Sequence, residues 1–261
     1  MKQFDPHHIP GIYNWCDRWC EHCKMTSKCY LYAQEQEDKA IMESDLDHDE
    51  KMEKIKEKLT ETMEMLSEAA EEFEMDEEDM EELDEEEQDE MMHDHQISQI
   101  KIDIHPLSDL SEIYMKECMD WVESKGKDTL LGYLVQSKIP EEICDQNEIE
   151  KLKKVISHLE SVQWNQTMIP AKCRGALNYF SDKSFWDDYP IEERAYNGTA
   201  KVALICIQNS INAWQGILFW SKDEEELILP LLDKLIQIKQ MLEEEFPNAY
   251  KFIRPGFDEN C

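Results

Sequence analysis

The chain has 261 residues, enough for one large domain or two small ones with a packed core. Its formal net charge is −33, and only seven residues are glycine. A surface this negative repels nucleic acid and anionic lipid, so we expect neither a nucleic-acid nor a membrane partner. The shortage of glycine disfavours a fold with many strands and tight turns.

The acidic charge is concentrated in one part of the chain. Residues 45–95 contain 25 acidic residues and four lysines, a net charge of −21, and the rest carries −12. Such a segment attracts cations and basic proteins. We therefore expect that any partner is a basic protein or a redox partner, and the sequence leaves the oligomeric state open.

The first element in chain order is a compact group of thiols at Cys16, Cys20, Cys23 and Cys29, spaced C-x3-C-x2-C-x5-C. The N-terminus resembles no signal peptide, so we expect a cytoplasmic protein in which thiols stay reduced. Four neighbouring thiolates repel one another unless a cation neutralises them. The spacing therefore predicts that these four cysteines bind a metal.

Three interpretations of this cysteine group stay open. Compact single-loop spacing is typical of an iron–sulfur cluster such as 4Fe-4S, whereas zinc sites usually place two C-x2-C pairs further apart. The third interpretation is a set of ordinary thiols. Trp15, Trp19 and Tyr30 would shield either metal and do not discriminate between the two.

Parts of the loop resemble known iron–sulfur motifs. The Cys20–Cys29 half resembles the iron–sulfur loop of endonuclease III-type DNA glycosylases, although here the preceding gap has three residues where that family has six. The Cys16–Cys23 half resembles radical S-adenosylmethionine enzymes, with His22 at their aromatic position. No repeated strand–helix pattern or glycine-rich cofactor motif follows, which disfavours that second class.

Helical periodicity dominates the rest of the chain. Residues 51–73 carry apolar residues at three- and four-residue steps, which predicts an amphipathic helix. Residues 74–90 include 13 acidic residues, which predicts a solvated linker, or a helix only while the charge is neutralised. Further helices are expected over the following ranges: 107–122, capped by Ser108 or Ser111, 128–136, 147–168, 171–180 after a kink at Pro170, 193–220 and 223–245.

The predicted fold class is all-α, an up-and-down bundle of four or five long helices preceded by the cysteine-rich loop. The only candidate strand is Gln99–His105. The expected divisions are a metal-binding loop at 1–30, a charged helical segment at 31–73, an acidic low-complexity linker at 74–97, and the bundle at 98–261.

A second candidate site lies among the bundle helices. Lys172, Asn197 and Lys201 are polar residues in apolar surroundings, and a buried lysine needs a partner or a route to water. These residues predict either an anion or cofactor pocket, or plain ion pairing with an acid such as Glu192 or Glu193. His158 would add a titratable group if the pocket were an enzyme site.

Three segments together resemble an uncharacterised bacterial family of helical proteins with four N-terminal cysteines. They are Tyr13–Cys20, Asn197–Leu204 and Phe252–Glu259, at both ends of the chain. The resemblance implies no activity. Three functions therefore stay open: an iron–sulfur protein for electron transfer or redox sensing, a zinc-stapled protein-interaction module with an acidic segment, and an enzyme with a pocket between helices.

Overall fold

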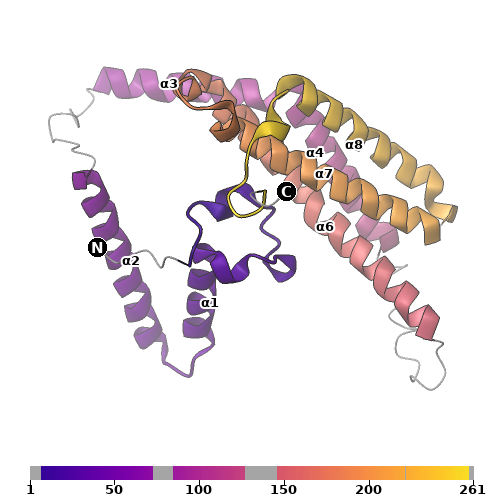
Figure 1. The fold of residues 1–261 in the computed structure, drawn as a ribbon, viewed down its shortest axis with the longest axis horizontal. Helices are drawn as coiled ribbons and strands as arrows, with labels where there is room; N and C mark the ends of the chain where they lie inside the picture. The colour runs from indigo at the N-terminus through magenta and orange to yellow at the C-terminus, as the bar shows by residue number, and fades with distance from the viewer. Residues whose placement is uncertain (1–6, 73–84, 127–145, 221, 259–261) are drawn as a thin grey trace. The chain divides into compact units, whose positions relative to one another are not determined.

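The computed structural model describes residues 7–72, 85–126, 146–220 and 222–258, and within these ranges it is helical and contains no strand (Figure 1). All-helical architecture is therefore confirmed for the described part of the chain. The helices are α1 (Tyr30–Glu43), α2 (His48–Glu72), α3 (Glu85–Asp103), α4 (Pro106–Trp121), α6 (Gln146–Ser181), α7 (Ala195–Trp220) and α8 (Glu225–Glu245).

The chain divides into two compact units. The N-terminal unit comprises Met1–Asn14 and Cys20–His95, and the bundle unit comprises Trp15–Trp19 and Gln96–Cys261. The short segment Trp15–Trp19 thus belongs to the bundle unit, although its neighbours on both sides belong to the other.

The N-terminal unit consists of a loop of short 3-10 turns followed by α1, α2 and the first part of α3. The Ile9 N–H donates to the Lys28 carbonyl at 3.0 Å and closes the loop. At the start of α2, Asp47 and Glu50 each accept the other's backbone N–H, at 2.9 and 3.2 Å. This reciprocal pair satisfies amides that have no partner within the helix and fixes where α2 begins.

The acidic segment differs from its predicted state. We expected a linker over 74–97, but residues 85–97 lie within α3, and the strand candidate Gln99–His105 was wrong because α3 continues to Asp103. Glutamate, glutamine and methionine are good helix formers, and their propensity outweighs the repulsion between the acids. Residues 73–84 lie outside the described part.

In the bundle unit, α6 packs against α7 and α4, and α8 packs against α4 and α7. These contacts form a closed ring of four helices around a single apolar core. The predicted helices 107–122, 193–220 and 223–245 are confirmed within a few residues at each end. The helix expected at 128–136 lies outside the described residues.

Pro170 lies inside α6, which runs from Gln146 to Ser181, so the helix continues beyond the proline as expected. One expectation about a helix start was wrong. The first turn of α4 is capped by His105, whose Nδ1 accepts the Leu107 N–H at 3.2 Å. Pro106 follows this cap at the first helical position, where a missing N–H costs nothing. Ser108 and Ser111 are instead buried within the helix.

Helix α7 supplies the largest share of the buried residues of the bundle unit. By length and composition alone it could cross a membrane, but half of its most apolar window is buried inside the protein. Such burial also characterises the central helix of a bundle.

A polar network lies at the centre of the bundle core. The Tyr114 hydroxyl lies 2.6 Å from the Ser210 hydroxyl and accepts the Trp214 Nε1–H at 3.1 Å. All three side chains are fully buried. The network joins α4 to α7, two helices that otherwise meet little along the ring.

We predict that Tyr114→Phe lowers the free energy of unfolding by about 1–3 kcal/mol, because it leaves the Ser210 hydroxyl and the Trp214 N–H unpaired in the core. Urea denaturation followed by circular dichroism measures the change. Tyr179→Phe removes a hydroxyl from a side chain that is 43% exposed and serves as the control. Equal urea midpoints for Tyr114→Phe and Tyr179→Phe would contradict the stabilising role of this buried network.

Candidate metal centre

The segment that carries the first cysteine is anchored to the bundle unit by two tryptophans and a carbonyl. Trp19 stacks on Trp164 with ring centroids 5.7 Å apart, and the Trp164 Nε1–H donates to the Asp17 carbonyl at 2.8 Å. Trp15 packs against Phe252 with ring centroids 4.7 Å apart. The backbone on both sides of Cys16 is therefore fixed against α6 and the C-terminal segment.

Gly198 makes the Trp15 contact possible. A Cβ atom at this position would lie 2.6 Å from a Phe252 ring carbon and 2.7 Å from Trp15 ring carbons. Only a residue without a side chain lets both rings approach the start of α7 this closely.

Cys16 itself is half-buried and surrounded by charged groups. Burial raises the pKa of its thiol, while a hydrogen bond from the Arg18 N–H and the nearby positive charges of Arg18 and Lys172 oppose that rise. Arg18 has a φ of 59°, a left-handed conformation that costs a non-glycine residue on the order of 1 kcal/mol. This turn directs the Arg18 N–H at the sulfur.

Lys172 is the basic residue of α6 that faces this thiol. Burial lowers its pKa, and the proximity of Cys16 and Cys206 opposes that decrease. Burial also raises the pKa of Cys206, to about 12, so this second thiol is neutral at physiological pH. Lys172 therefore provides a positive charge on the bundle side of Cys16.

The other three cysteines lie in the N-terminal unit, half-buried in and beside its 3-10 turns. The Cys23 sulfur accepts the Met25 N–H at 3.3 Å. Cys29 caps α1, and its sulfur accepts the Tyr32 N–H at 3.5 Å. The N-terminus of a helix carries a partial positive charge, which is a favourable place for a negatively charged ligand atom.

Three of the four predicted ligands thus share one local geometry, in which sulfur accepts a backbone N–H from two or three residues further along the chain. Within residues 7–72, 85–126, 146–220 and 222–258, however, no three His, Cys, Asp or Glu side chains are arranged to hold a metal ion. The N–H groups directed at sulfur suit a thiolate-bound metal, but the cysteine side chains are not arranged as a complete set of metal ligands.

At the second candidate site, Lys201 pairs with residues of the C-terminal segment. The Lys201 ammonium donates to the Phe252 carbonyl at 2.6 Å and to Asp258 Oδ2 at 2.7 Å. Arg254 contacts the other oxygen of Asp258 at 2.9 Å. We call Lys201, Arg254 and Asp258 the tail clamp, because they hold the C-terminal segment on α7.

Asn197 and His158 also make contacts with other residues of the chain. The buried Asn197 amide donates to the Ile191 carbonyl at 3.2 Å, which fixes the turn before α7. His158 on α6 lies against Gly216 of α7, where a Cβ atom would overlap the imidazole ring. Burial lowers the pKa of His158. These contacts favour structural roles, and the predicted anion or cofactor pocket stays a prediction.

The sequence prediction missed how the two ends of the chain combine. It proposed Glu192 or Glu193 as the acid beside Lys201, whereas the acid is Asp258, 57 residues away in sequence. The three segments that carried the family resemblance meet in one place, through the Trp15–Phe252 contact and the tail clamp. The Arg254-Pro255-Gly256 turn was the only sequence signal that the tail folds back.

Comparisons with known proteins add no further information on function. No family model matches the chain, and searches of curated proteins and of solved structures also found no match.

The tail clamp leads to a prediction about pH. Burial alone would raise the pKa of Asp258, but hydrogen bonds from Arg254 and Lys201 outweigh it and hold this pKa well below its ordinary value. A carboxyl with a depressed pKa stabilises the fold above its unfolded-state pKa of about 4, and this stabilisation is lost as the pH falls further.

We therefore expect Asp258→Asn to lower the free energy of unfolding by about 1–3 kcal/mol at neutral pH, with a difference from the parent that shrinks progressively below about pH 4. Urea denaturation over a pH series measures it. The exposed Asp120→Asn variant is the control, because within the described part of the chain the Asp120 carboxylate has no ion pair like those of Asp258. A difference that stays constant down to about pH 2 would contradict the clamp.

Proposed function

We propose that Cys16, Cys20, Cys23 and Cys29 together bind one iron–sulfur cluster, and that the protein carries an electron or senses redox state. The observation that supports this best is the set of backbone N–H groups directed at the sulfur atoms of Cys16, Cys23 and Cys29. Hydrogen bonds to the ligand sulfurs are among the main means by which a protein tunes a cluster.

The charges around Cys16 are consistent with this proposal. Arg18 and Lys172 both lower the energy of a negative sulfur at this position, and the negative charge of Asp17 opposes them. A metal would replace the proton of a thiol whose pKa is raised by burial, so metal binding should strengthen as the pH rises. When bound, an iron–sulfur cluster would supply a one-electron carrier. The positive charges beside the ligands would favour its reduced, more negative state.

The anchoring of the Cys16 segment is the second observation that supports the proposed metal site. Trp15, Asp17 and Trp19 fix the Cys16 segment to the bundle unit, while Cys29 is fixed at the start of α1. The four ligands lie within a segment of 14 residues, so a local rearrangement of the loop is enough for one cation to bind all of them. Metal sites are commonly completed by the metal itself.

Zinc remains the alternative metal, because N–H groups directed at sulfur and a C-x2-C pair also suit a four-thiolate zinc site. In that case the metal would staple the N-terminal loop, and the protein would act as an interaction module. Elemental analysis distinguishes the two metals directly, since iron is required by the first function and absent from the second.

We expect protein prepared without oxygen to absorb near about 400 nm and to contain iron and inorganic sulfide, because thiolate-to-iron charge transfer colours such clusters. Cys23→Ser should remove the absorbance and most of the iron. Cys144→Ser, which changes a thiol outside the four, should leave both unchanged. Colourless protein with about one zinc per chain would exclude the iron–sulfur function, and protein without either metal would exclude both.

A further inference from the structure

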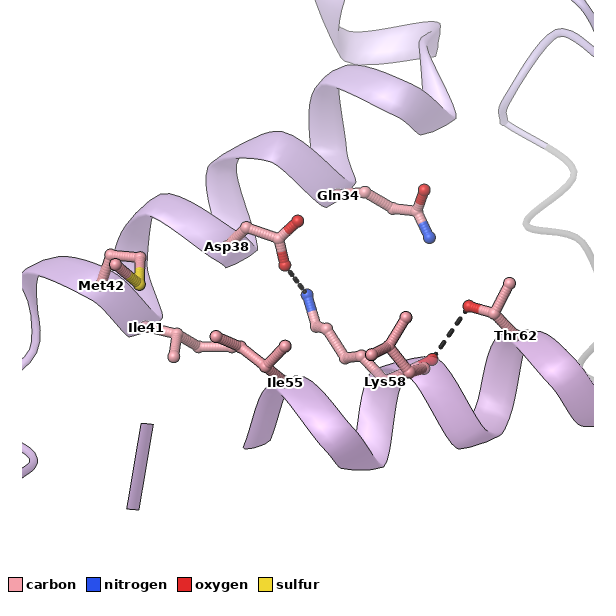
Figure 2. Close-up of a pocket in the computed structure, with 8 residues that line it drawn as sticks. Gln34, Asp38, Ile41, Met42, Ile55, Lys58 and Thr62 are labelled. Carbon is pink, nitrogen blue, oxygen red and sulfur yellow. Dashed lines mark hydrogen bonds and ion pairs between the residues drawn. The ribbon is translucent and has the colours of Figure 1, made fainter. Parts of the chain in front are cut away.

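A groove lies between α1 and α2 in the N-terminal unit (Figure 2). Its volume is about 410 Å³. In Figure 2, Ile41 and Met42 of α1 and Ile55 of α2 lie on the two sides of the groove. Lys58 of α2 reaches across it to Asp38 of α1, with the ammonium 2.6 Å from the carboxylate.

The apolar face around this groove is not covered by the two helices that form it. Met42 is 60% exposed, Leu59 61% and Met63 68%. No described side chain of α1 or α2 is buried. An apolar helix stripe normally packs on another element, and within the described part of the N-terminal unit no element buries this face.

The charge around the groove restricts what can cover it. Residues 30–72 contain 15 acidic residues and five lysines, a net charge of −10, and the remaining residues of the chain carry −23. Lys58 is already paired with Asp38 and with Glu37, at 2.6 and 3.3 Å. A second copy of this acidic surface would therefore be repelled, whereas a cationic partner would be attracted.

We propose that the groove between α1 and α2 binds a basic amphipathic helix of a partner protein. The apolar face of that helix would contact Ile41, Ile55 and Leu59, and its lysines and arginines would face the acidic positions of the two helices. Recognition of an amphipathic helix in an apolar groove is a common mode of binding between proteins. A small molecule fits less well, because such ligands are normally enclosed and these side chains are exposed.

The dimensions of the stripe set the length of the partner. On α2 the exposed or half-buried apolar residues Met52, Ile55, Leu59 and Met63 recur along one face. With a rise of about 1.5 Å per residue they cover about 16 Å, or three helical turns. Three methionines, at positions 42, 52 and 63, contribute to this surface. Their flexible side chains adapt to different apolar partners.

This inference does not depend on the proposed metal centre, since no cysteine lines the groove. The test uses the full chain and a fluorescein-labelled peptide of about 18 residues, made of leucine and lysine with all leucines on one helical face. Fluorescence anisotropy at about 0.15 M salt, where surface attraction is strongly screened, measures binding. A peptide of the same composition in scrambled order tests whether charge alone is sufficient.

We expect the amphipathic peptide to bind the parent protein, and Leu59→Gln combined with Met63→Gln to weaken binding by at least about tenfold. The matched control combines Leu227→Gln with Leu229→Gln, two similarly exposed leucines of α8, and should bind like the parent. Circular dichroism and thermal melting show whether each variant keeps the parent fold, and glutamine is a good helix former.

Four outcomes would overturn the proposal. They are equal binding to the parent and the groove variant, equal binding of the scrambled peptide, absence of measurable binding, and a parent dimer that the groove variant dissociates in sedimentation experiments. The last outcome would assign the groove to a second copy of the chain. The metal content of the same preparations is measured in parallel, so that loss of the metal centre and failure of the groove remain distinguishable.

Discussion

The close approach of two aromatic rings over Gly198 determines how the segment Trp15–Trp19 packs within the bundle unit. Trp15 and Phe252 both lie where any side chain at position 198 would stand. Their contact fixes the segment that carries Cys16, and the same C-terminal segment is held on α7 by the tail clamp. The first proposed ligand thus owes its position to residues nearly the whole chain length away.

This arrangement gives the cysteines unequal surroundings. Cys16, Cys23 and Cys29 each accept a backbone N–H, and Cys16 in addition lies near the positive charges of Arg18 and Lys172 in the bundle unit. In each case the local backbone presents a positive dipole to sulfur before any metal is considered. We interpret this as preparation for thiolate ligands, because a core thiol such as Cys173 has burial as the main influence, which raises its pKa, and contacts the Ser111 side chain instead of a backbone N–H.

Helical periodicity was sufficient to predict most of the fold. The apolar stripes of α2, α4, α7 and α8 are regular, and regular stripes identify helices whatever they pack against. Pro170 was harder to interpret, because a proline within a long helix is tolerated when the surrounding packing holds the chain helical. The acidic run was interpreted as a linker because net charge was weighed above the helix propensity of glutamate.

The candidate sites were predictable only in part. Spacing alone singled out the four cysteines, since close thiols are costly without a cation. Periodicity cannot show which distant residue pairs with Lys201, because the partner Asp258 lies in an irregular tail that shares no pattern with α7. The groove between α1 and α2 also could not be predicted from the sequence. An apolar stripe indicates which face of a helix is apolar, but not whether another element covers that face.

The central claim is that four sulfur atoms share one metal centre, and thiol protection tests it most directly. Anaerobically prepared protein is alkylated with iodoacetamide before and after chelation, and each cysteine is quantified by mass spectrometry. The account predicts that Cys16, Cys20, Cys23 and Cys29 are protected together and become reactive together once the metal is removed. Independent reactivity of the four, unchanged by chelation, would contradict it.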